Sequence, residues 1–135
     1  MSQRSLVLIK PDGVRRGLTG AILSRFEAKG FEIQAMALRT LDKQTADQHY
    51  AEHVEKGWYP ELREFITSGP LVSLVLSGDQ AIEIIRQMVG ATDGRKAAPG
   101  TVRGDYSLSN QENLIHASDS EDSAAREIAL FFPEL

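Results

Sequence analysis

Short apolar runs alternate with helix-like patterns along this 135-residue chain, and their order constrains the fold more than any other feature. The runs at residues 5–9, 31–38, 71–76 and 114–116 predict strands. The second run alternates apolar and polar side chains, which is typical of a half-exposed strand. The run 71–76 is too short for a helix and predicts a buried strand.

Helical patterns fill most of the intervals between these strands. The first expected helix is capped by Thr19 and ends at Lys29-Gly30. The second begins at Asp42 or Thr45 and ends near Glu55, a short third helix covers residues 61–65, and a fourth begins at Asp79. The last helix covers residues 123–131 behind a capping-box spacing at 118–121. Two strand-helix-strand units in one chain predict an α+β fold. The expected form is a ferredoxin-like split βαβ sandwich, with helices packed on a four-stranded antiparallel sheet.

Length and composition predict a single domain over residues 1–135, without repeats or a linker. Fifteen Lys and Arg against 19 Asp and Glu give a net charge of −4, so we expect no specific nucleic-acid partner. Within the first run only the four residues 6–9 are apolar, far fewer than a signal sequence or a spanning helix needs, so we expect no membrane partner and a cytoplasmic protein. The absence of Cys excludes a thiol nucleophile.

Two segments between the elements carry turn-forming residues. Pro11-Asp12-Gly13 predicts a turn after the first strand. Residues 90–104 hold four glycines and a proline without periodicity, and a loop of this length is usually functional or interfacial. The sequence contains neither a Walker A motif nor G-x-G-x-x-G, so a phosphate site needs another construction.

His49 and His53 lie four residues apart on an expected helix and could face one metal ion. The zincin pattern requires Glu after the first histidine, and Tyr50 stands there instead. We therefore expect no metal ligand at these positions, and solvated or helix-capping histidines instead.

His116 ends a short apolar run directly before an expected helix. Helix N-termini favour anions, so a phosphate beside this imidazole would be stabilised. A core histidine hydrogen-bonded to a neighbour explains the residue equally well. Glu127 could hold one ring nitrogen, and Lys10, Arg86 and Arg103 could neutralise a phosphoryl group, although each is also explained as a solvated side chain.

Several motifs follow one another in a fixed order along the whole chain. They are Lys10-Pro11-Asp12-Gly13-Val14, His49-Tyr50, Ser68-Gly69-Pro70, Gly90-Ala91-Thr92, Pro99-Gly100-Thr101-Val102-Arg103-Gly104-Asp105 and Asn113-Leu114-Ile115-His116-Ala117-Ser118-Asp119-Ser120. In this order and spacing the sequence resembles the nucleoside diphosphate kinase family. The resemblance favours His116 as a nucleophile over a core histidine.

The resemblance implies an enzyme that transfers the terminal phosphoryl group of a nucleoside triphosphate, typically ATP, to a nucleoside diphosphate. The mechanism would be ping-pong through a phosphohistidine on His116. Residues matching the family's catalytic positions are His116, Glu127, Lys10 and Tyr50, and those matching its substrate-binding positions are Lys10, Trp58, Leu62, Arg86, Thr92, Arg103 and Asn113. Mg²⁺ would be bound mainly through the nucleotide phosphates, without a dedicated metal ligand in the chain.

Two departures from the family pattern affect these expectations. Gly57-Trp58-Tyr59 replaces Pro-Phe-Phe, so Trp58 would stack on the base unless its ring belongs to the core. Asp93-Gly94 replaces Asn-Pro, and the glycine is expected to loosen the long loop. This loop makes subunit contacts in hexameric relatives. We expect a homo-oligomer, with a hexamer favoured and a tetramer possible.

Two other function classes stay open. A catalytically silent ferredoxin-like module could bind nucleotides or nucleic acid. A phosphocarrier would pass its phosphoryl group to another protein, and discharge by GDP or UDP alone would distinguish the kinase from it. The combined set of His116, Glu127 and the cationic residues favours the kinase.

Overall fold

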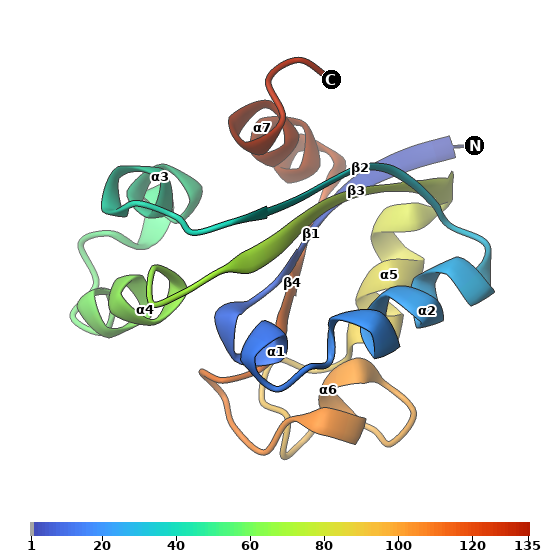
Figure 1. The fold of residues 1–135 in the computed structure, drawn as a ribbon, viewed down its shortest axis with the longest axis horizontal. Helices are drawn as coiled ribbons and strands as arrows, with labels where there is room; N and C mark the ends of the chain where they lie inside the picture. The colour runs from blue at the N-terminus through green and yellow to red at the C-terminus, as the bar shows by residue number, and fades with distance from the viewer. Residues whose placement is uncertain (1) are drawn as a thin grey trace.

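The computed structural model describes residues 2–135 as a four-stranded sheet with helices on both faces (Figure 1). In chain order the elements are β1 (Ser2–Ile9), α1 (Pro11–Arg15), α2 (Thr19–Lys29), β2 (Glu32–Arg39), α3 (Lys43–His49), the 3₁₀ turn η1 (Ala51–His53), α4 (Tyr59–Ile66), β3 (Leu71–Asp79), α5 (Ala81–Val89), α6 (Val102–Tyr106), β4 (Ile115–Ala117) and α7 (Glu121–Phe131).

The strands are ordered β2-β3-β1-β4, and every neighbouring pair is antiparallel. The α+β ferredoxin-like class predicted from the sequence is therefore confirmed. The edge strand β4 pairs with β1 over only three positions, Val7↔Ala117, Leu8↔His116 and Ile9↔Ile115. This short pairing fixes His116 at the edge of the sheet.

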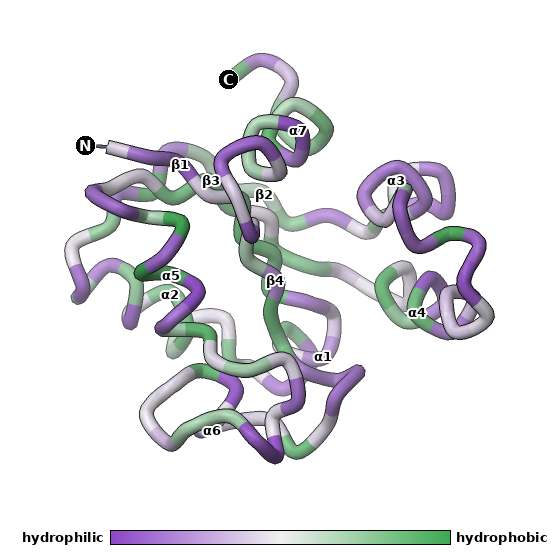
Figure 2. The backbone as a smooth tube through the Cα atoms, turned by 180° about the vertical axis from the view of Figure 1, so that it is seen from behind, coloured by the Kyte–Doolittle hydropathy of each residue, from purple (hydrophilic) through white to green (hydrophobic). Residues whose placement is uncertain are grey.

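The core lies on both faces of the sheet because successive side chains of a strand point in opposite directions. Val7 and Ile9 belong to the apolar cluster under α2 and α5, whereas Leu6 and Leu8 belong to the cluster under α7. Figure 2 shows apolar residues along the central strands and hydrophilic residues over α3. Within residues 2–135, no helix is both long and apolar enough to cross a membrane.

The tripeptide Pro11-Asp12-Gly13 was expected to form a turn, and the structure shows that it begins α1 instead. Proline is favourable at the first helical position because its missing N–H would have no partner there. Asp12 in the first turn adds a favourable charge at the positive end of the helix. The turn prediction was wrong because these residue types also begin helices.

Several predicted helix ends also need correction. Thr19 is the first residue of α2 but not its cap, because Leu18 occupies the cap position without a side-chain hydrogen bond. The α3 helix follows Asp42, whose carboxylate accepts a 2.7 Å hydrogen bond from the Thr45 amide, and it ends before the predicted residue Glu55.

The later elements differ in similar ways. β3 extends past residue 76 to Asp79, so Asp79 belongs to a strand and α5 begins after Gln80, which has φ 50°. The long loop contains the start of α6, capped by Thr101, whose hydroxyl accepts from the Gly104 amide at 2.9 Å. Ser120, rather than a box over 118–121, caps α7.

Candidate active site

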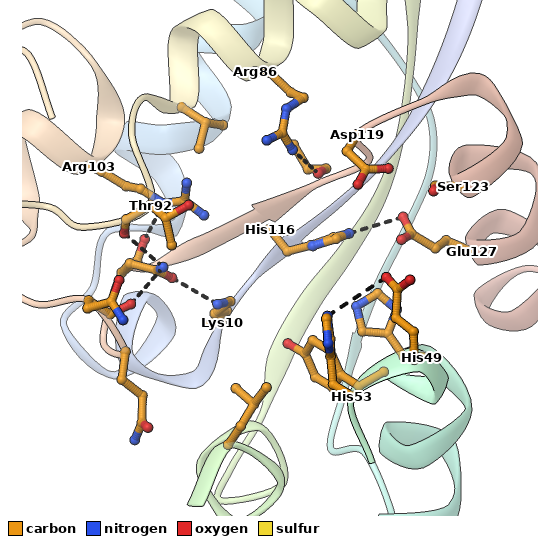
Figure 3. A pocket seen from close by; sticks show the side chains of 18 of the residues that line it. Lys10, His49, His53, Arg86, Thr92, Arg103, His116, Asp119, Ser123 and Glu127 are labelled. Carbon is orange, nitrogen blue, oxygen red and sulfur yellow. Dashed lines mark hydrogen bonds and ion pairs between the residues drawn. The ribbon is translucent and has the colours of Figure 1, made fainter. Parts of the chain in front are cut away.

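A cleft of about 640 Å³ opens where α3, η1 and α4 face α5, β4 and α7, and its volume suits a nucleotide-sized ligand. All the site residues predicted from the sequence line it: Lys10, Tyr50, Trp58, Leu62, Arg86, Thr92, Arg103, Asn113, His116 and Glu127. Figure 3 shows His116 between the cations Lys10, Arg86 and Arg103 on one side and Glu127 on the other.

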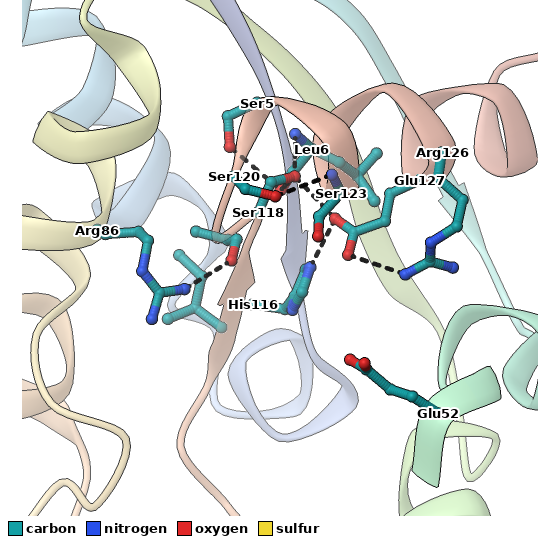
Figure 4. A network of polar contacts seen from close by, with 12 residues as sticks. Ser5, Leu6, Glu52, Arg86, His116, Ser118, Ser120, Ser123, Arg126 and Glu127 are labelled. Atoms are coloured by element: carbon teal, nitrogen blue, oxygen red, sulfur yellow. Dashed lines mark hydrogen bonds and ion pairs between the residues drawn. The ribbon is translucent and has the colours of Figure 1, made fainter. Parts of the chain in front are cut away.

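His116 is the middle residue of β4, and its ring projects into the cleft. Its Nε2 lies 3.0 Å from Oε1 of Glu127, which comes from α7 (Figure 4). Because the carboxylate accepts a hydrogen bond, Nε2 carries the proton in the neutral ring, and Nδ1 has the free electron pair.

Glu127 is held in place by further contacts and is only 4% exposed. The Ser118 hydroxyl donates to the same Oε1 at 2.7 Å, and Arg126 Nη2 lies 3.7 Å from Oε2. Ser118 is itself fixed, because its oxygen accepts from the Leu6 amide at 3.0 Å. Glu127 is therefore a preorganised partner for the His116 ring.

Lys10 directly follows β1 and lines the cleft. Its Nζ donates to Asn113 Oδ1 at 2.8 Å, and the Asn113 amide nitrogen donates to the Thr92 carbonyl at 3.0 Å. Burial, followed by the charge of Arg103, lowers the pKa of Lys10 to about 8. The ammonium group is therefore less stable here than in water, and an anion in the cleft would compensate for this.

Arg103 on α6 is fixed by backbone carbonyls at each nitrogen of its guanidinium group. Nε donates to Asn113 O at 3.2 Å, Nη1 to Gly90 O at 3.0 Å and Nη2 to Ile115 O at 2.5 Å. Burial, followed by the charge of Arg86, lowers the pKa of Arg103 to about 10. Arg86 on α5 donates to the Ala117 carbonyl at 3.1 Å, so both cations lie beside the His116 strand.

His49 was expected to be solvated or to cap a helix, and this expectation was wrong. The ring is only 4% exposed, and its centroid lies 4.7 Å from that of His116 in an edge-to-face contact. Within the described residues, neither ring nitrogen of His49 has a hydrogen-bond partner. Burial, followed by the charge of His116, holds the pKa of His49 well below its usual range.

The same region holds a group of candidate metal ligands that the sequence pattern did not predict. His49, His116 and Glu127 each offer one ligand atom, and these atoms lie within 4.8 Å of one another. His53, the partner considered from the sequence, lies outside this group, and its Nε2 is 3.8 Å from Glu52 Oε1. The burial of Tyr50, beside His49, raises its pKa, so its hydroxyl group keeps its proton.

Trp58 and Leu62 line the cleft on the side of α4. Trp58 is 51% exposed, so the alternative of a core tryptophan is wrong. The Lys56 ammonium lies 5.4 Å from the centroid of the indole ring, and the His53 ring lies 5.3 Å from it. An exposed aromatic face is therefore available at the cleft.

Sequence reasoning did not single out several residues that the cleft contains, among them Asp119, Ser123 and Arg126. A hydrogen bond from Ser123 holds the pKa of Asp119 below its usual value, so this carboxylate stays ionised. The signal for Asp119 was its place in the motif block around His116. Ser123 and Arg126 carried no local signal, because only the packing of α7 brings them to the cleft.

A sheet that holds a carboxylate-supported histidine among arginines and a lysine has the features of a nucleotide-dependent phosphotransferase. The chain belongs to the nucleoside diphosphate kinase family, whose pattern matches residues 3–135. It is 66% identical over 135 residues to the nucleoside diphosphate kinase of Nocardioides sp., with all of both chains covered, and 60% identical over 133 residues to that of Thermobifida fusca, with 98% of each covered.

The fold matches a solved structure equally well. The halophilic nucleoside diphosphate kinase from Halobacterium salinarum, in complex with CDP, superimposes with a TM-score of 0.96 at 47% identity, covering 99% of this chain and 90% of that one. The chain therefore has the function of its family, an enzyme of the kinase class that binds nucleotides. These similarities give no support to a catalytically silent binding module.

Proposed function

We propose that the exchange of phosphoryl groups between nucleotides runs through a phosphohistidine on His116. The main support for this proposal is the 3.0 Å contact between His116 Nε2 and the buried Glu127 carboxylate, inside a cleft lined by cations. In the first half-reaction a bond forms between Nδ1 and the terminal phosphorus, while the bond from phosphorus to the leaving diphosphate oxygen breaks. The second half-reaction returns the group to an oxygen of another nucleoside diphosphate.

Glu127 acts on the His116 ring. As Nδ1 gives its electron pair to phosphorus, positive charge develops on the imidazole, and the adjacent carboxylate stabilises that charge. Ser118 keeps the carboxylate in position, so little reorganisation is needed during the reaction.

Lys10, Arg86 and Arg103 neutralise the phosphate oxygens. The guanidinium group of Arg103 is preorganised by its carbonyl contacts, and Lys10 is held by Asn113. Thr92 and Asn113, which are joined by a hydrogen bond, are proposed to contact phosphate or sugar hydroxyl groups, and Tyr50, whose ring contacts that of His49, is proposed to belong to the surroundings of His116. Fixed charges of this kind are usually the largest contribution in phosphoryl transfer.

Trp58 is proposed to stack on the nucleotide base, with Leu62 at its edge. The solved halophilic relative binds CDP, which supports a cleft of this kind for nucleotides here. Stacking uses the π-face that every base has, so this contact discriminates weakly between bases.

Mg²⁺ is proposed as the cofactor, bound mainly through the nucleotide phosphates. This ion prefers oxygen ligands and keeps several waters, and the ionised Asp119 carboxylate in the cleft would hold it on the protein side. When bound, the ion would neutralise charge between the two distal phosphates. The nitrogen-rich group of His49, His116 and Glu127 is a poor match for such a hard cation.

We also propose that residues 1–135 act as one domain, in the cytoplasm, within a homo-oligomer. A hexamer is favoured over a tetramer. Apolar side chains on the edge strand β2 support an oligomer, because Met36 is 55% and Leu38 is 67% exposed. Native mass spectrometry of the purified protein measures the subunit number directly, and a monomer would refute the proposal.

Two-substrate kinetics test the ping-pong mechanism. With Mg-ATP and GDP varied together, we expect parallel double-reciprocal lines, because the enzyme releases ADP before it binds GDP. Intersecting lines would require a ternary complex and would refute the phosphoenzyme route. Failure of free GDP or UDP to accept the phosphoryl group would favour a phosphocarrier.

A further inference from the structure

His49 has an unusual position for a side chain that the proposed mechanism does not use. It is the last residue of α3, it is buried against the His116 ring, and within residues 2–135 both of its ring nitrogens lack a hydrogen-bond partner. Buried polar atoms are nearly always paired, and a bound ion is one of the few explanations for an exception. The atoms around His49 show which ion would fit.

His49, His116 and Glu127 come from three different elements, α3, β4 and α7, and their ligand atoms lie within 4.8 Å of one another. Two imidazole nitrogens and one carboxylate oxygen form the ligand set of many zinc sites with an open fourth position. Harder ions such as Mg²⁺ prefer oxygen ligands alone. The three residues therefore favour a cation of borderline softness, which accepts both nitrogen and oxygen ligands.

We propose that His49, His116 and Glu127 form a binding site for a borderline divalent cation, best matched by Zn²⁺, and that a bound ion blocks phosphorylation of His116. The ion would take the place of the proton between His116 Nε2 and Glu127 Oε1, which are 3.0 Å apart. His49 would supply the third ligand, and the fourth position would open to the cleft.

The observed ring positions are close to what such an ion needs. Two imidazoles on one tetrahedral Zn²⁺, with bonds of about 2.0–2.1 Å, place their ring centres roughly 5 Å apart. The centres of His49 and His116 are 4.7 Å apart, and the ring planes are inclined by 84°. Because the ligand atoms lie within 4.8 Å of one another, His49 needs at most a small inward shift to reach the ion. Arg126, whose Nη2 lies 3.7 Å from Glu127 Oε2 and whose Nη1 donates to the Gln48 carbonyl at 3.3 Å, is 48% exposed, so a bound ion can displace it toward solvent.

Binding of the ion by these three residues depends on their geometry alone. Inhibition by the ion also rests on the proposed role of His116 as the nucleophile. An ion on Nε2 withdraws electron density from the ring that must attack phosphorus. It also places positive charge where positive charge develops in the reaction. Both effects slow formation of the phosphoenzyme.

Binding is tested on the nucleotide-free protein by titration with Zn²⁺ alone against a chromogenic chelator. The wild type is expected to bind one ion. His49→Phe, which keeps a ring in the buried position, is expected to bind at least tenfold more weakly, since removal of a direct ligand exceeds the roughly 10–100-fold effect of outer contacts. His53→Gln is the matched control, because His53 lies outside the group, and it is expected to bind like the wild type.

Absence of binding, or an equal loss in His53→Gln, would overturn the site. A measurement on the wild type is independent of how the variants fold: X-ray absorption at the zinc edge should show two imidazoles and one carboxylate. An all-oxygen shell, or a single imidazole, would overturn the assignment.

The inhibition is tested by the rate of His116 phosphorylation from Mg-ATP with and without Zn²⁺, each variant being compared with itself. We expect Zn²⁺ to slow the phosphorylation of His116 in the wild type and in His53→Gln. In His49→Phe this slowing should be lost. Equal slowing in His49→Phe would mean that Zn²⁺ acts on ATP, and would overturn the inhibition. No phosphorylation of the metal-free wild type would instead contradict the proposed function, whatever the zinc result.

Discussion

Glu127 uses both of its carboxylate oxygens within the protein, one near His116 and Ser118 and the other near Arg126. A buried carboxylate is costly unless it is paired, so its position beside the histidine needs a compensating role. Support of the charge that develops on the His116 ring is such a role.

Glu127→Gln keeps the shape of the side chain but removes its charge. We expect kcat to fall by about 10²-fold or more, with little change in KM, because the carboxylate acts on the ring rather than on the nucleotide. Ser118→Ala, which removes only one contact to Glu127, should have a smaller effect. Steady-state kinetics on both variants measure this, and a change confined to KM would contradict the assigned role.

Lys10 is expected to make phosphate binding in the cleft depend on pH. Its pKa is lowered to about 8, so its ammonium group loses its proton as the pH rises through that value, and phosphate binding weakens. We expect kcat/KM, which reports the free enzyme, to decline above about pH 8. In Lys10→Arg the guanidinium stays protonated, and this decline should disappear. The same alkaline decline in the variant would assign it to another group.

Replacement of Trp58 should weaken the binding of all nucleotides by a similar factor. Stacking contributes about 1–3 kcal/mol per base, so Trp58→Ala should raise KM roughly 5–150-fold, by a similar factor for purines and pyrimidines. Trp58→Phe keeps an aromatic face and should retain most of the affinity. Kinetics with matched GDP and CDP series check this. An increase for one base alone would show that the ring reads base identity.

Among the elements, the loop before α6 is more tightly packed than expected from the glycine at position 94. The Gly94 amide donates to the Ser109 carbonyl at 3.0 Å, a bond that proline could not make. A Cβ at Gly94 would lie 2.4 Å from the Ser107 side chain. The expectation that glycine loosens this loop was incomplete, because it considered backbone freedom and not close packing.

Gly94→Ala should therefore destabilise the fold, by about 1–3 kcal/mol, since the added methyl group overlaps Ser107. Gly20→Ala is the matched control. Gly20 is exposed on α2 with no atom within 4 Å of an added Cβ, so alanine there should stabilise by roughly 0.5–1 kcal/mol. Urea unfolding measures both, and effects of the same sign would contradict this account.

At the scale of the whole molecule, the sheet could be predicted from the sequence because strand patterns are local. The run at 5–9 is apolar on both faces because β1 is central and covered on both sides, and the alternation at 31–38 reflects the half-exposed edge strand β2. Helix ends were less predictable, because Leu18 and Gln80 begin helices without a side-chain cap.

The candidate active site, too, could be predicted from the sequence only in part. Motifs identified the residues of the cleft, since spacing along the chain is visible in the sequence. The burial of His49 was not predictable, because it depends on α3 packing against β4 and α7 from distant parts of the chain. The electrostatic environment of Lys10 likewise depends on Arg103, which is remote in sequence.

Intact-mass spectrometry tests directly whether His116 carries the phosphoryl group. The protein is incubated briefly with Mg-ATP, its mass is compared at neutral and acid pH, and excess GDP is then added. We expect an acid-labile gain of one phosphoryl group, which GDP removes as GTP forms, and no gain in His116→Ala. No gain in the wild type, or an equal gain in His116→Ala, would contradict it.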